Sequence, residues 1–186
     1  MKVTIINLEK KQFKTIDNNT KYVLISNSYN NIGEYLNLKI KPILILYNGA
    51  YVIDLENNSV IINKSINVNS LDKIIKYSNS HDIDINYYKN NDIIYGLKLL
   101  VNNYHRRLVI PYMFKDLYPD VKCDTVNKEI YVFDKKVSLL NAISESLNYL
   151  NIKNNYIELE NIYINVSDNG YYRDNVSMKG YELYEN

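Results

Sequence analysis

Residues 42–54 read Pro-Ile-Leu-Ile-Leu-Tyr-Asn-Gly-Ala-Tyr-Val-Ile-Asp. An unbroken apolar run ends at Asn48-Gly49, and a second apolar run leads from Ala50 to Asp54. Asn-Gly between two apolar runs is a strong signal for a tight turn, because both residues tolerate the positive φ angles that hairpin turns require. The stretch therefore predicts a buried strand, a turn and the antiparallel partner strand.

The apolar segments outside this hairpin predict an α/β fold. Period-two alternation and short apolar runs predict strands at 3–8, 22–25, 60–62, 83–87, 108–110, 129–133 and 162–166. Helical spacing of apolar residues predicts helices at 30–38, 70–80, 92–104 and 138–150. Predicted strands near both ends of the chain flank a middle segment in which strands and helices are mixed. We therefore expect a core formed by residues 1–65 and 134–186, with an inserted αβ cap subdomain at 66–133.

The composition is that of a globular protein, with 46% hydrophobic and 23% charged residues. Lys and Arg number 22 against 21 Asp and Glu, so the charge balance favours neither nucleic acid nor an anionic membrane as a partner. No apolar window is long enough for a membrane span, and the first residues are too polar for a signal peptide. Cys123 is the only cysteine, which favours a reducing compartment. We expect a cytoplasmic location.

Four segments in chain order resemble the motifs of one enzyme superfamily. They are Val-Leu-Ile-Ser-Asn-Ser at 23–28, Asn-Gly-Ala at 48–50 with Asp54, Asp-Lys-Lys at 134–136 before a helix that Ser138 can cap, and Ile-Asn-Val-Ser-Asp at 164–168. Their order and spacing resemble the haloacid dehalogenase-like (HAD) superfamily, in particular its Cof-type phosphatases. The resemblance covers most of the chain, and its sharpest part is the Asn-Gly-Ala hairpin.

The resemblance implies a Rossmann-like parallel sheet core with a small inserted cap, and phosphoryl transfer through an aspartyl-phosphate. In that chemistry one Asp attacks phosphorus, a second Asp acts as acid and base, and Mg²⁺ neutralises charge between carboxylate and phosphate. The matching positions here are Asn7 for the nucleophile, Glu9 for the acid/base, Ser26 after the second strand, Lys136 before the late helix, and Asp168. Asp168 is also the candidate Mg²⁺ ligand.

Several of these positions depart from the family pattern. An amide at Asn7 is a poor nucleophile and carries no charge for Mg²⁺, which prefers carboxylate and phosphate oxygens. Lys10 and Lys11 replace the Gly and Thr of the family loop, Ser28 replaces the usual Arg, and the helix expected between the first two strands has no counterpart in the sequence. The departures predict a damaged phosphoryl-transfer site.

Two other segments have alternative interpretations. Ile-Asp-Asn-Asn-Thr at 16–20 superficially resembles the phosphatase loop, which would make Asp17 a substitute nucleophile, but a plain turn is the competing interpretation. His105-Arg106-Arg107 forms a small basic cluster. It could hold a substrate phosphate from the cap, or it could be an ordinary surface turn.

Three hypotheses for function follow. The first is a degenerate HAD-like protein, catalytically weak or inactive, that serves as a ligand- or protein-binding scaffold without a cofactor. The second is a Mg²⁺-dependent phosphatase of a small phosphorylated metabolite. The third is an interaction protein on an unrelated α/β fold. The expected partners are a small phosphorylated ligand, a protein or a second copy of the chain, and neither nucleic acid nor membrane.

Overall fold

The computed structural model describes residues 2–9, 16–151 and 181–184. Contacts between residues divide the chain into two compact units. One combines Met1–Asn63 with Ser138–Asn186, and the other is Lys64–Val137.

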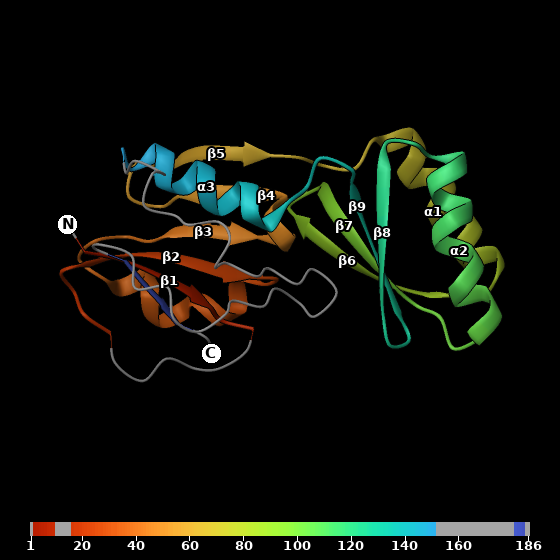
Figure 1. Cartoon of the computed structure of the whole chain (residues 1–186), viewed down its shortest axis with the longest axis horizontal. Coiled ribbons are helices and arrows are strands. Elements are labelled where there is room, and N and C mark those ends of the chain that lie inside the picture. Colours follow the sequence, from red (N-terminus) through yellow and green to blue (C-terminus); the bar gives the residue numbers. More distant parts are fainter. Residues whose placement is uncertain (1, 10–15, 152–180, 185–186) are drawn as a thin grey trace. The chain divides into compact units, whose positions relative to one another are not determined.

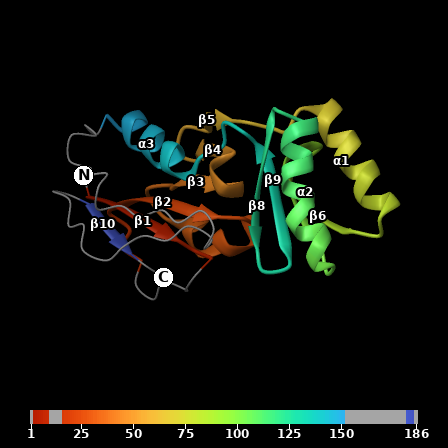
Figure 2. The same ribbon diagram turned by 45° about the vertical axis from the view of Figure 1, so that its right-hand side comes forward.

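The first unit is built on a six-stranded sheet (Figures 1 and 2). Its strands are β1 (Lys2–Asn7), β2 (Thr20–Ser26), β3 (Ile43–Leu46), β4 (Tyr51–Asp54), β5 (Ser59–Asn63) and β10 (Tyr181–Tyr184), in the spatial order β10-β1-β2-β3-β4-β5. The first four strands in that order are parallel, and β4 and β5 extend the sheet in antiparallel fashion. This arrangement confirms the predicted α/β fold with a parallel sheet.

The hairpin predicted from residues 42–54 is present. Strands β3 and β4 pair in antiparallel register and are joined by a short 3-10 turn, η2 (Tyr47–Gly49). Tyr47, Asn48 and Gly49 all have positive φ angles, of 53°, 57° and 89°. Asn and Gly adopt this backbone region at low cost, which is why the dipeptide marks the turn.

One helix and one 3-10 segment cover the two faces of this sheet. Helix α3 (Leu139–Tyr149) packs on one face, where its stripe of buried residues joins the core cluster of β1, β2, β3 and β4. Ser138 caps α3 by accepting a hydrogen bond from the N–H of Asn141 at 3.2 Å, as the sequence predicts. On the other face η1 (Tyr29–Asn37) places the Tyr35 ring edge-on against Tyr22, with ring centroids 5.5 Å apart.

The second unit contains a four-stranded antiparallel sheet with two helices on one face (Figure 1). Its elements are α1 (Val68–Ser80), β6 (Asp84–Asn90), β7 (Ile93–Leu100), α2 (Tyr104–Leu117), β8 (Val121–Val126) and β9 (Glu129–Asp134), and the strand order is β6-β7-β9-β8. The side chains that face the helices form a core of their own. In this unit the helix predicted at 70–80 and the strands at 83–87 and 129–133 are confirmed.

Two predicted elements in this unit were wrong. Residues 92–104 were predicted to be helical, but Ile93–Leu100 form β7, which pairs with strands on both sides. Tyr95, Leu97 and Leu99 are all buried at alternate positions, so the run fits period two as well as the helical spacing that we used. Residues 108–110 were predicted to form a strand, but they lie in the middle of α2. Three apolar residues are too few to fix a period.

Strand β8 was missed, because its alternation of Val121, Cys123 and Thr125 with polar residues is weak. The strand predicted at 162–166 lies outside the described residues. In the part of the chain that the structure describes, no helix is both long enough and apolar enough to cross a membrane.

Candidate functional site

The candidate site lies at the carboxyl ends of β1 and β2, where the sequence places Asn7, Glu9 and Ser26. The two strands are parallel and adjacent, and Asn7 pairs in register with Ile25. The residue after β1 still pairs with β2, because the N–H of Leu8 donates a hydrogen bond to the carbonyl of Ile25 at 2.9 Å. Ligand sites in parallel α/β sheets form at this edge. The fold therefore brings three of the five predicted site residues together.

Asn7 ends β1 with its side chain buried at 1% exposure. Its Oδ1 accepts a hydrogen bond from the N–H of Glu9 at 3.1 Å. This contact bends the chain after the strand and uses the amide oxygen as an acceptor within the loop. The position that the family resemblance assigns to the nucleophile therefore holds a buried neutral amide that helps to shape its own loop.

The Glu9 carboxylate is held by groups from β2 and the start of η1. Its Oε1 accepts from the N–H of Asn27 at 2.7 Å and from the side-chain amide of Asn31 at 3.3 Å, and it lies 2.9 Å from the hydroxyl of Ser26. The Ser26 hydroxyl also lies 2.8 Å from the carbonyl oxygen of Ser28. Charge-assisted hydrogen bonds of this kind are stronger than neutral ones. They fix the loop after β1 against the loop after β2.

No motif in the sequence indicates the roles of Asn27 and Asn31. Both contacts depend on the turn that leads into η1, where Ser28 accepts a hydrogen bond from the N–H of Asn30 at 3.1 Å and caps the segment. The apolar spacing predicted a helix at 30–38, but it could not show that the turn before the helix would face Glu9.

The structure does not place two other candidates, Lys136 and Asp168, relative to this cluster. Lys136 is exposed and belongs to the unit Lys64–Val137, so the structure does not place its amine relative to Asn7. It lies two residues before the Ser138 cap, and its N–H donates to Asp134 at 2.8 Å. Asp168 lies outside the described residues.

Asp17 lies at the amino end of β2, where its carboxylate accepts from the N–H of Asn19 and the hydroxyl of Thr20 at 2.9 and 2.8 Å. The length of β2, about 20 Å at 3.3 Å per residue, separates it from Ser26. Asp17 is therefore a turn residue, as the alternative interpretation had it. His105-Arg106-Arg107 is not a surface turn, because it forms the first turns of α2, after the Asn103 cap.

A buried ion pair lies at the end of the first sheet that is opposite the carboxyl ends of β1 and β2. Lys21 Nζ is 2.7 Å from Asp54 Oδ1 and 2.8 Å from Glu56 Oε2, and the Lys21 and Asp54 side chains are at most 3% exposed. Burial opposes ionisation of Asp54. The hydrogen bond and charge of Lys21, with hydrogen bonds from Glu56 and Asn57, outweigh it and hold the pKa of Asp54 below its ordinary value. The pair ties the amino end of β2 to the end of β4.

Comparison with known proteins decides the family. Residues 2–175 match the family of haloacid dehalogenase-like hydrolases. The chain belongs to this family. The match confirms the resemblance drawn from the motifs and excludes an unrelated α/β fold. No curated protein matches the chain at a significant level.

Several solved structures share the fold at low sequence identity. A haloacid dehalogenase-like hydrolase from Bacteroides thetaiotaomicron is 10% identical, with a TM-score of 0.66 over 82% of this chain and 78% of that one. A HAD subclass IIB sugar phosphatase is 11% identical, with a TM-score of 0.61 over 82% and 77%. A protein from Thermotoga maritima is 16% identical, with a TM-score of 0.61 over 81% and 75%. At these identities the likeness establishes the fold alone.

The donor set of the HAD site does not suit Mg²⁺ in the described residues. The cation takes oxygen ligands, and carboxylates supply the charge that offsets its dehydration. Among residues 2–9, 16–151 and 181–184 no group of three or more His, Cys, Asp and Glu side chains could hold a metal. At the carboxyl edge Asn7 is neutral, and Oε1 of Glu9 is shared among hydrogen-bond donors.

Proposed function

We propose that this HAD-like protein is catalytically weak or inactive and uses the family fold as a ligand- or protein-binding scaffold. One observation carries the proposal. The position that would attack phosphorus is the amide of Asn7, and its oxygen accepts the N–H of Glu9. An amide cannot form the acyl-phosphate that a carboxylate forms, and removal of a covalent nucleophile costs several orders of magnitude in rate.

The engagement of Glu9 supports the same conclusion. A general acid must present a proton to the leaving oxygen, and a general base must take one from water. The Oε1 atom of Glu9 is directed to Asn27, Ser26 and Asn31 instead. We therefore assign Glu9 a structural role in joining two loops. In this proposal the unit Lys64–Val137 is the inserted cap.

The ligand is proposed by analogy. One structure of the same fold is a sugar phosphatase, so a small phosphorylated compound is the first candidate for the carboxyl edge of β1 and β2. A protein partner or a second copy of the chain is the alternative occupant. Binding of inorganic phosphate or a sugar phosphate, followed by the amide NMR signals of Asn7, Glu9 and Asn27, distinguishes the small ligand from a protein partner.

The catalytic proposal is tested with p-nitrophenyl phosphate and Mg²⁺. We expect the wild-type protein, Asn7→Ala and Asp168→Ala to release nitrophenol at the rate of the protein-free control. The competing hypothesis is a Mg²⁺-dependent phosphatase that uses another carboxylate. It predicts turnover several orders of magnitude above that control, which Asp168→Ala or Glu9→Gln would abolish while the protein stays folded. That result would overturn the proposal.

A further inference from the structure

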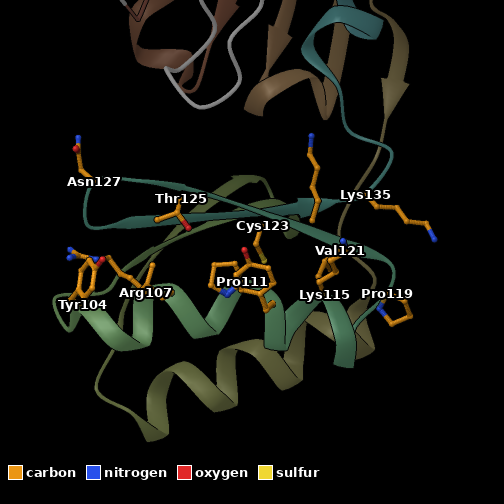
Figure 3. A pocket seen from close by; sticks show the side chains of 13 residues that line it. Tyr104, Arg107, Pro111, Lys115, Pro119, Val121, Cys123, Thr125, Asn127 and Lys135 are labelled. Atoms are coloured by element: carbon orange, nitrogen blue, oxygen red, sulfur yellow. The ribbon is translucent and has the colours of Figure 1, made fainter.

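The second unit has a groove between helix α2 and strand β8 (Figure 3). Its volume is about 740 Å³, and every residue that lines it belongs to the unit Lys64–Val137. From β8 the alternating residues Val121, Cys123 and Thr125 contribute to one wall, and Figure 3 shows them opposite the side chains of α2. The groove therefore runs along a strand.

The helical wall presents apolar side chains that nothing in the described structure covers. Tyr104, Leu108 and Tyr112 lie at four-residue spacing on α2 and are 61%, 51% and 73% exposed. Residues four apart share one face of a helix. Pro111 also lines the groove and has no N–H, so the carbonyl of Arg107 does not receive its usual helical hydrogen bond. The wall is therefore largely apolar.

The charged residues that line the groove are all positive. Arg107, Lys115, Lys122 and Lys135 line it, and the described lining includes no carboxylate. Asp120, which is close in sequence, accepts hydrogen bonds from Ser70 at 2.8 and 2.9 Å instead. Lys122 donates to the carbonyl of Val137, and burial lowers its pKa. Arg107, Lys115 and Lys135 therefore supply most of the positive charge available to a partner.

Strand β8 is at the edge of the four-stranded sheet formed by the described residues. Alternate residues of an edge strand point their N–H and C=O groups away from the sheet, where another extended chain can pair with them. The helix wall from Tyr104 to Lys115 is about 17 Å long at 1.5 Å per residue. That length matches about five residues of extended chain.

We propose that the groove between α2 and β8 binds an extended acidic peptide segment of a partner protein, which adds to β8 as a further strand. The backbone of the peptide pairs with β8. Its apolar side chains pack on Leu108, Pro111 and Tyr112, and its carboxylates meet Arg107, Lys115 and Lys135. Strand addition beside a helix is a known mode of peptide recognition, in which main-chain hydrogen bonds give affinity and side-chain contacts give specificity.

The test measures fluorescence anisotropy of a labelled extended peptide whose alternate residues are glutamate, valine and glutamate, with threonine between them, so that all three can face α2. We expect saturable binding by the full chain that weakens as salt is added, and no binding of the matched basic peptide with lysine in place of glutamate. The double variant Lys115→Glu/Lys135→Glu should lose about tenfold in affinity. Lys73→Glu, at an exposed position on α1 outside the groove, should bind as the wild type does.

A second probe tests the strand addition itself without altering the protein. The acidic peptide with N-methyl groups at alternate backbone nitrogens keeps its charge and side chains but loses donors. We expect one of the two N-methylation registers to abolish binding. Equal binding of both registers, equal binding of the acidic and basic peptides, or the absence of saturable binding would overturn the proposal.

Discussion

Glu9 and Ser26 meet across the carboxyl ends of two parallel strands, with the Glu9 carboxylate oxygen 2.9 Å from the Ser26 hydroxyl. The two residues are 17 positions apart in the sequence. Register between β1 and β2 brings their loops to the same edge of the sheet. The carboxylate that the family motif would assign to proton transfer is thereby part of a hydrogen-bonded cluster with Ser26, Asn27 and Asn31.

Glu9→Gln is expected to weaken this hydrogen-bonded cluster. The replacement keeps the shape but removes the charge that strengthens the hydrogen bond from the N–H of Asn27, so the free energy of unfolding should fall by about 1 kcal/mol. Chemical denaturation measures the loss, and the Asn27 amide proton should shift upfield in the NMR spectrum. Glu34→Gln, at an exposed position on η1, is the matched control and should change neither. Equal behaviour of the two variants would contradict the role of Glu9.

Gly49→Ala is expected to be strongly destabilising. Gly49 has a φ angle of +89°, and a Cβ there would lie 2.8 Å from the carbonyl oxygen of Ser138 and 2.9 Å from Cβ of Ala142. Backbone strain and overpacking at the start of α3 together should cost about 3 kcal/mol. Gly33→Ala, where an added Cβ meets nothing within 4 Å, should stay within about 0.5 kcal/mol of the wild type. Thermal or urea unfolding compares the two variants.

Tyr35→Phe and Tyr22→Phe should change the free energy of unfolding differently, although the two rings are in contact. The Tyr35 hydroxyl is buried without a hydrogen-bond partner among the described residues, and burial raises the pKa of Tyr35 to about 12. Removing that hydroxyl should leave stability unchanged or raise it by up to about 1 kcal/mol. The Tyr22 hydroxyl accepts from the N–H of Asp17 at 2.8 Å, so Tyr22→Phe should lose about 1 kcal/mol. A loss in Tyr35→Phe as large as in Tyr22→Phe would refute the assignment.

Asp54→Asn should change the response to acid. The folded state holds the pKa of Asp54 below the ordinary 3.8, so the carboxylate stabilises the protein above that pH, and the contribution is lost as pH falls through the folded pKa. The variant leaves the buried ammonium of Lys21 without its closest anion, and should lose about 2 kcal/mol at neutral pH. The difference from the wild type should shrink below about pH 4. Urea unfolding from pH 7 to pH 2.5 checks this, and a constant difference over that range would contradict it.

Part of the fold could be predicted because local chemistry and tertiary structure agree there. Asn48-Gly49 permits the positive φ angles of the turn, and Ser138 supplies the cap of α3. Residues 93–100 could not be assigned from spacing, because the run fits both a helical and a strand period. These residues form a strand because they pair with β6 on one side and with β9 on the other.

The candidate site shows the same division. The sequence predicted Asn7, Glu9 and Ser26 as site residues, with a neutral amide at the position that the resemblance assigns to the nucleophile. The hydrogen bonds of Glu9 to Asn27 and Asn31 depend on the turn before η1, which no motif specifies. The groove between α2 and β8 was also not predictable, because β8 was missed and 108–110 had been assigned to a strand.

By itself the sequence determined the side-chain chemistry: an amide at position 7, an Asn-Gly turn at 48–49 and a family pattern along most of the chain. Those are properties of single residues and their neighbours, which covalent structure and local conformation fix. Tertiary structure alone decided which oxygens and nitrogens meet across β1, β2 and η1, and which face of α2 stays open beside β8. Such contacts depend on strand register and packing between distant segments, and local sequence does not encode them one residue at a time.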